Sequence, residues 1–136
     1  MKLAVGAPIE FRSFDTITRE GLRKYADASG DFNQIHLDDD VAKKAGLPGI
    51  IAHGMLIAAQ VAERAREFVA NEASLSGYEL VKFQSRFKAM TLVGDTPSVG
   101  GTIKEMGDQE LLLELQAKNQ RGEITTQGLA KFKKSL

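Results

Sequence analysis

The feature that most restricts the fold is the order of two hydrophobic patterns along the chain: a helical pattern comes first, and the alternation typical of strands follows. Residues 53–70, HGMLIAAQVAERAREFVA, form the longest stretch with the composition of a single helix. The part from 55 to 59 is apolar on every side, whereas the part from 63 to 67 carries several charges. A helix that is apolar all round is normally buried, so we expect the start of this helix to lie in the core.

After residue 71 the period changes to the alternation of apolar and polar side chains that is typical of β-strands. In the first alternating segment, four side chains share one face: Val81, Phe83, Ser85 and Phe87. Strands are expected over the early segment 9–15 and over the later segments 81–88, 111–116 and 124–132. Residues 95–106 are expected to form a turn followed by another strand.

One strand, then helices, then four strands in antiparallel succession predict the α+β fold class. A curved antiparallel sheet wrapped around one long central helix buries the apolar surfaces of both. The 136 residues contain no repeat or low-complexity linker, so we expect a single domain over residues 1–136. Because such a sheet leaves an exposed edge that a second copy could cover, we also expect a homodimer.

Two shorter helices precede the long one. Thr18 can cap a helix that Gly30 ends, and the acidic run 38–40 suits the positive end of a second helix over residues 41–45, which Gly46 ends.

Composition excludes several classes of function. The formal net charge is zero, which argues against nucleic acid held by bulk charge. The absence of cysteine excludes disulfides, thiolate nucleophiles and cysteine-based metal sites. The first residues, MKLAVGAPIEF, lack the apolar core of a signal peptide, and no window is long enough to span a membrane. We therefore expect a cytoplasmic protein.

Several familiar motifs fail when they are tested against the sequence. The stretch SGDFNQIHLDDD, residues 29–40, begins like a calcium loop but has Ile35 and His36 where a ligand and a glycine are needed. GIIAHG, residues 49–54, has phosphate-loop spacing without the lysine that must follow. His36 and His53 have no convincing third ligand, so we expect no metal.

What remains is an acid, an amide and a histidine in one loop. Asp31 and His36 lie five positions apart across a predicted turn, close enough to share one water, and such a pair can move protons near neutral pH. The backbone N–H of Gly54 at the helix start could polarise a carbonyl. Taken singly, each residue also has an ordinary interpretation: Asp31 as a turn residue, Asn33 as a left-handed position, and His53 as a structural group bonded to nearby backbone.

The combination favours a specific family. YADASGDFNQIHLDDDVAKKAGLPGIIAHGM, residues 25–55, resembles the signature of the MaoC-like dehydratases, the (R)-specific enoyl hydratases, which runs Y-A-x-x-S-G-D-x-N-P-[IL]-H-x-D, a short helix, then [IV]-A/V-H-G-M. A weaker second block, RFKAMTLVGD at residues 86–95, resembles the family's following strand and turn. The resemblance implies the hot-dog fold, which agrees with the layout read from periodicity.

The resemblance also implies a reaction, the interconversion of trans-2-enoyl and (R)-3-hydroxyacyl thioesters carried on coenzyme A or acyl carrier protein. Asp31 and His36 would be the catalytic pair, with His36 acting on water and Asp31 on carbon. The Gly54 N–H would bind the thioester oxygen, and Asn33 would steady the loop or the water. No cofactor is expected, because coenzyme A or phosphopantetheine belongs to the substrate.

Three positions depart from the family pattern. Gln34 and Met90 stand where proline is usual, and Ala59 stands where some members place a serine near the catalytic water. Two alternatives stay open at this point: an acyl-thioesterase on the same fold, and a non-catalytic partner subunit of a heterodimeric dehydratase. The retained Asp31–His36 pair argues against the second of these.

Overall fold

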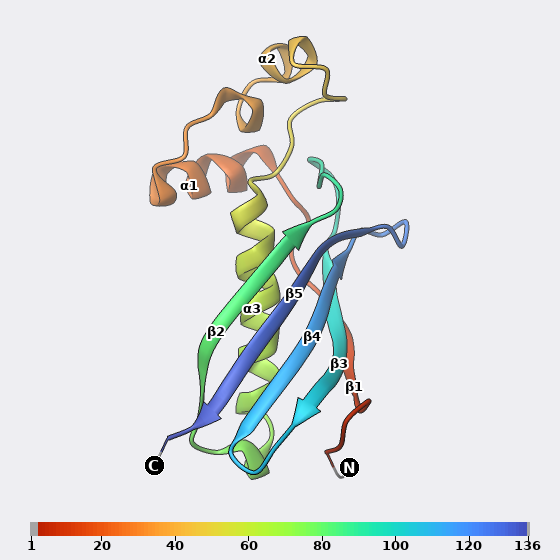
Figure 1. The fold of residues 1–136 in the computed structure, drawn as a ribbon. Helices are drawn as coiled ribbons and strands as arrows, with labels where there is room; N and C mark the ends of the chain where they lie inside the picture. Colours follow the sequence, from red (N-terminus) through yellow and green to blue (C-terminus); the bar gives the residue numbers. More distant parts are fainter. Residues whose placement is uncertain (1–2, 136) are drawn as a thin grey trace.

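The computed structural model describes residues 3–135 and contains one antiparallel sheet with a long helix along one face (Figure 1). Its strands are arranged in the order β1-β3-β4-β5-β2. The elements, in chain order, are β1 (Pro8–Ser13), α1 (Arg19–Ser29), the 3-10 turn η1 (Gln34–His36), α2 (Asp39–Lys44), α3 (Gly54–Ala70), the 3-10 turn η2 (Ala73–Leu75), β2 (Tyr78–Phe87), β3 (Ser98–Met106), β4 (Glu110–Lys118) and β5 (Ile124–Lys134). The expected α+β class and the succession of one strand, helices and four strands are confirmed.

The sheet and α3 form the core by pressing their apolar faces together. Strands β4 and β5 alternate, so that every second side chain points toward α3: Leu111, Leu113, Leu115, Ala130 and Phe132 are buried there. The facing helix residues are Ile57, Ala58, Val61, Ala65 and Val69. Burial of these side chains supplies the main stabilising term of the domain, because removal of apolar area from water drives folding.

A glycine on β5 allows this packing to be close. A Cβ atom added at Gly128 would lie 2.6 Å from Cγ1 of Val61, which is closer than such atoms approach. The helix therefore rests directly on the backbone of β5 at this point, two turns from its own first residue.

The expectation that residues 55–59 are buried on all sides is wrong for the single chain. Met55 is 61% exposed and Ala59 is also exposed. The physical reason is that one sheet covers only one face of α3, and these two side chains lie on the other face.

The expected face of β2 also needs correction at one position. A register shift between Leu80 and Lys82 makes a bulge, so Leu80 packs on the core and Val81 is exposed instead. Beyond the bulge, Phe83 packs on the core as predicted. Bulges of this kind change which residues face the core without any signal in the alternation itself.

The two short helices lie beyond the N-terminal end of α3 (Figure 1). The hydroxyl of Thr18 accepts a hydrogen bond from the N–H of Gly21, and Gly30 ends α1 with a φ of 79°, as the sequence predicted. Asp38 caps α2 by accepting from the N–H groups of Asp40 and Val41. Among residues 3–135, no helix combines the length and apolar character needed to cross a bilayer.

The loop after β2 holds the start of α3 in place. Leu92 pairs with Ile51 in an isolated bridge, and the N–H of Ala52 donates to the carbonyl of Thr91 at 2.8 Å. The buried carboxylate of Asp95 closes this loop by accepting from the N–H of Leu92 at 2.9 Å. The same carboxylate accepts from the side chains of Gln120 and Arg121 in the β4–β5 connection.

Candidate active site

The loop between α1 and α2 is shaped by its own polar side chains. The Oδ1 of Asp31 accepts from the N–H of Asn33 at 3.1 Å, and the Oδ1 of Asn33 accepts from the N–H of Ile35 at 3.2 Å. Asn33 thereby caps the turn η1, whose last residue is His36. Two successive side-chain-to-backbone bonds thus fix the loop, which places Asp31 at its exposed start and His36 at its buried end.

The imidazole of His36 is oriented by a backbone carbonyl. Its Nδ1 lies 2.8 Å from the carbonyl oxygen of Ile51, and the side chain is buried. Because a carbonyl oxygen only accepts hydrogen bonds, Nδ1 carries the proton in the neutral ring, and Nε2 is left with a free lone pair. His36 is therefore set up to accept a proton at Nε2.

His53 is buried and lies against the ring of His36. It is 1% exposed, and its Nε2 donates to the backbone carbonyl of Asp31 at 3.1 Å. Its ring stacks on that of His36, with centroids 3.9 Å apart and an angle of 24° between the planes. The ring of Tyr25 also packs against His53, with ring centroids 4.7 Å apart. Burial lowers the pKa of His53, and the bond to the Asp31 carbonyl offsets only part of that shift. His53 is therefore neutral at pH 7.

Asp31, His36 and His53 are brought together, although 22 positions separate the first from the last. One nitrogen or carboxylate oxygen from each side chain lies within 4.8 Å of one from each of the others. A span of that size between Asp31 and His36 can be bridged by a single water that hydrogen-bonds to both. The structure thus brings a carboxyl group and an imidazole to one potential solvent position.

The same three side chains could be considered as a metal site, which the sequence did not predict. Zinc lies about 2.0–2.1 Å from a histidine nitrogen, along its lone pair and in the plane of the ring. Two planes that are stacked 3.9 Å apart and inclined by only 24° do not meet within that distance. In addition, Nδ1 of His36 and Nε2 of His53 already contact carbonyl oxygens. The geometry therefore fits proton transfer and does not fit zinc.

Gly54 is the first residue of α3, and it is exposed to solvent. The first N–H groups of a helix have no partner within the helix, and they carry the positive end of its dipole. The ring of Phe87, at the end of β2, lies against this glycine. Neither Phe87 nor Tyr25 is among the site residues predicted from the sequence. Tyr25 begins the stretch that resembles the family signature, whereas only a tertiary contact brings Phe87 here.

The three departures from the family pattern have different surroundings. Gln34 begins η1, and its Nε2 donates to the carbonyl of Phe32 at 3.2 Å, so a hydrogen bond stands where proline would restrain the loop. Ala59 is an exposed residue of α3, and Met90 is 44% exposed in the loop after β2. None of the three displaces Asp31 or His36.

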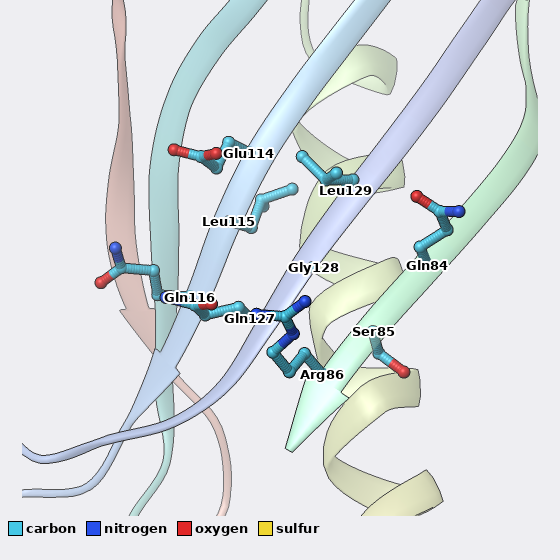
Figure 2. Close-up of a pocket in the computed structure, with 9 residues that line it drawn as sticks. All are labelled: Gln84, Ser85, Arg86, Glu114, Leu115, Gln116, Gln127, Gly128 and Leu129. Atoms are coloured by element: carbon cyan, nitrogen blue, oxygen red, sulfur yellow. The ribbon is translucent and has the colours of Figure 1, made fainter. Parts of the chain in front are cut away.

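A hollow of about 570 Å³ on the sheet is separate from this site. Its lining comes from β2, β4 and β5, and Figure 2 shows that polar side chains dominate it: Gln84, Arg86, Glu114, Gln116 and Gln127. By strand alternation these side chains point away from α3. No candidate site residue lines the hollow.

Comparisons with known proteins show which family this domain is similar to. A family model described as a MaoC like domain matches residues 2–123. Fatty acid synthase 2 from Mycosarcoma maydis is 34% identical over 111 residues, which is 79% of this chain but 3% of that protein. The 3-hydroxyacyl-thioester dehydratase X of Mycobacterium tuberculosis is 49% identical over 45 residues, 33% of this chain and 16% of that protein. The chain thus spans only a small part of these relatives.

A solved structure extends the agreement over the whole fold. The (R)-hydratase from A. caviae involved in PHA biosynthesis has a TM-score of 0.79, covers 98% of both chains and is 24% identical. The expected hot-dog fold is confirmed by this likeness and by the sheet and central helix described above. With a family model that matches most of its length, the chain belongs to the MaoC-like domain family.

Proposed function

We propose that this domain interconverts trans-2-enoyl and (R)-3-hydroxyacyl thioesters by adding or removing one molecule of water. The observation that carries the proposal is the meeting of Asp31 and His36 at the N-terminal end of α3, with side-chain atoms no more than 4.8 Å apart. The reaction needs a base and an acid around one water, beside a group that stabilises negative charge on the thioester oxygen.

In the direction of hydration, the water oxygen bonds to the β-carbon while one member of the pair takes a proton from the water. The other member gives a proton to the α-carbon, so the elements of one water are added to the double bond. The free lone pair on Nε2 of His36 favours His36 as the group that acts on water, with Asp31 acting on carbon. The proton taken from the water makes up for the one given to the α-carbon, and exchange within the pair or with solvent returns both groups to their starting states.

The thioester oxygen becomes negatively charged as the enolate develops. The N–H of Gly54 stands at the positive end of a 17-residue helix and can donate to that oxygen without reorganisation. Asn33 keeps the loop of the catalytic pair in position through its bond to Ile35. Coenzyme A or the phosphopantetheine of an acyl carrier protein enters as part of the substrate, and the proton chemistry requires no further cofactor.

We also propose that the domain works as a homodimer. Strand β2 is an edge of the sheet, and α3 exposes Met55 and Ala59 on the face that the sheet leaves uncovered. A second copy that continues the sheet at β2 would satisfy the free backbone groups of the edge. Light scattering coupled to gel filtration should give twice the 14.8 kDa mass of the chain, and a monomer at micromolar concentration would contradict this.

The direct test of the activity is hydration of crotonyl-CoA by the purified protein. We expect loss of enoyl absorbance without release of free thiol, and chiral chromatography of the product should give the (R)-3-hydroxy thioester. Thiol release at the same rate as substrate loss would instead indicate a thioesterase. A folded protein without activity on crotonyl-CoA, longer enoyl-CoA thioesters or enoyl acyl carrier protein would favour the non-catalytic partner subunit.

A further inference from the structure

The side chain of Phe87 lies at the N-terminal end of α3. If Gly54 carried a Cβ atom, that atom would lie 3.1 Å from Cζ, 3.2 Å from Cε1 and 3.4 Å from Cε2 of the Phe87 ring. All three are ring carbons at the far end of the side chain, so the tip of the ring approaches the glycine. The space that a side chain would occupy at position 54 is occupied by this aromatic ring.

The geometry of a helix relates that contact to the proposed site. In an α-helix each Cα–Cβ bond tilts toward the N-terminus, and the unpaired N–H groups leave the helix at the same end. A ring on the Cβ side of the first helical residue therefore flanks the space in front of its N–H. That space is where the oxygen of a thioester would lie in the proposed reaction.

Phe87 is largely exposed, so its ring is not part of the hydrophobic core. The ring is 52% exposed, whereas Phe83, on the same face of β2, packs against the core. The backbone behind the ring is nonetheless held firmly, because the N–H groups of Lys88 and Ala89 both donate to the carbonyl of Thr125, at 2.8 and 3.2 Å. In the single chain, an aromatic ring on a fixed strand end thus presents apolar surface beside Gly54, and the chain's own core does not use this surface.

We propose that Phe87 determines specificity at this site by excluding substituents on the α-carbon of the substrate; the inference rests on the proposed hydration. In this proposal the α-carbon lies on the side of the ring and the sulfur on the other side of the carbonyl carbon, whose oxygen would bind the Gly54 N–H. When a proton adds to it, the α-carbon becomes tetrahedral, and its other substituents bend away from the proton donor. A hydrogen at this position can move toward the ring, whereas a methyl group would collide with it.

The test compares two substrates that differ by one methyl group, crotonyl-CoA and its 2-methyl analogue, tiglyl-CoA. The wild-type protein should prefer crotonyl-CoA in kcat/KM. In Phe87→Ala the ratio of kcat/KM for tiglyl-CoA to that for crotonyl-CoA should rise by roughly tenfold or more, the scale on which a pocket distinguishes one methyl group. Phe87→Leu, which keeps an apolar side chain without the flat ring, should give a smaller rise in the same direction.

A matched control is available on the opposite edge of the sheet. Phe11 on β1 is 44% exposed and lies under the ammonium group of Lys118, so Phe11→Ala removes a similar ring and should leave the substrate ratio unchanged. Circular dichroism and thermal unfolding establish that each variant is folded. If Phe87→Ala does not fold, Phe87→Leu carries the test.

Three outcomes overturn the inference, and they differ in what they say about the activity. A folded Phe87 variant that hydrates crotonyl-CoA with the wild-type substrate ratio, within about twofold of it, refutes the role of Phe87 and leaves the proposed function intact. A wild-type protein that hydrates neither these two thioesters, nor longer enoyl-CoA thioesters, nor enoyl acyl carrier protein refutes both. A rise in the ratio that occurs equally in Phe11→Ala also overturns the inference, because the effect would not belong to the ring beside Gly54.

Discussion

The imidazole rings of His36 and His53 are stacked 3.9 Å apart, and His53 also donates a hydrogen bond to the backbone carbonyl of Asp31. One buried side chain therefore contacts both members of the proposed catalytic pair. His53 touches no reacting atom in the proposed mechanism, so it acts by positioning. Its effect should be visible in the rate of the chemical step and should be small in substrate binding.

This relationship can be tested by separating the two contacts. His53→Gln keeps a hydrogen-bond donor but loses the ring, and His53→Phe keeps a ring but loses the donor. We expect each to lower kcat by about tenfold or more, the scale found for groups that orient a reacting residue, with a much smaller change in KM. Steady-state kinetics on crotonyl-CoA measures both quantities. A variant that raised KM at constant kcat would indicate a substrate-binding role instead.

The lowered pKa of His53 has a consequence for stability. The folded state binds a proton at this ring less readily than the unfolded state, whose histidines titrate near 6.5. The stability due to the neutral, buried ring is therefore present above that pH and is lost as the pH falls below it. Urea unfolding at pH 7, 6 and 5 should show a decline of at most about 1.4 kcal/mol per pH unit from this single group.

The variant His53→Gln provides the comparison for this decline, because glutamine does not titrate. Its free energy of unfolding should depend less on pH between 7 and 5 than that of the wild-type protein. Parallel curves for the two proteins would mean that His53 takes up its proton equally well in the folded and unfolded states.

The proposed catalytic pair has its own test. Asp31→Asn keeps an oxygen that can accept from the N–H of Asn33 but removes the acid, and His36→Ala removes the base. Each should reduce the turnover of crotonyl-CoA by well over ~100-fold, the usual scale for a positioned acid or base. Thermal unfolding should show that both variants fold. Near-normal turnover in either would refute the role assigned to that residue.

The buried carboxylate of Asp95 holds the loop after β2 by accepting from the N–H of Leu92. The same loop accepts a hydrogen bond from Ala52, just before the start of α3. Asp95→Ala leaves the N–H of Leu92 and the amide of Gln120 without their acceptor, so it should lower the free energy of unfolding by about 1–3 kcal/mol. The ion pair adds little to this figure, because Arg121 is half exposed and regains water. Urea unfolding at pH 7 measures the loss.

The pH dependence of the stability that Asp95 contributes gives a second readout. Burial raises the pKa of Asp95, but hydrogen bonds from the Leu92 N–H, Arg121 and Gln120 outweigh it, so the net pKa lies below the ordinary 3.8. The charged carboxylate therefore stabilises the protein above that pH, and the stabilisation disappears as the pH falls through the lowered value. The difference between wild type and Asp95→Asn should shrink between pH 4 and pH 2, and a constant difference would contradict this account.

Local sequence signals predicted much of this architecture because their physical causes are local. The cap at Thr18 and the left-handed stop at Gly30 depend on neighbouring atoms only, and so does the alternation along β4 and β5. Asp31 and His36 stand in one short loop, and the side-chain caps of that loop, which the local sequence can supply, bring the two residues near each other.

The parts that the sequence did not reveal depend on contacts between distant segments. The bulge that turns Val81 outward is set by pairing with β5, and the stacking of His53 on His36 needs α3 to meet the loop. The approach of Phe87 to Gly54 depends on where a strand ends relative to a helix start. Periodicity along one segment carries no information on such distances.

The lack of a side chain at Gly128 is a requirement for the position of α3, and therefore for the position of Gly54 in the proposed site. A methyl group there would push α3 outward at Val61, and a helix moves as a stiff rod, so its first residue would shift as well. Displacements of about 1 Å are enough to cost two orders of magnitude in a positioned reaction. A residue with no reactive atom, about 10 Å along the helix from the amide that would receive the substrate, thus restricts which sequences can retain the activity.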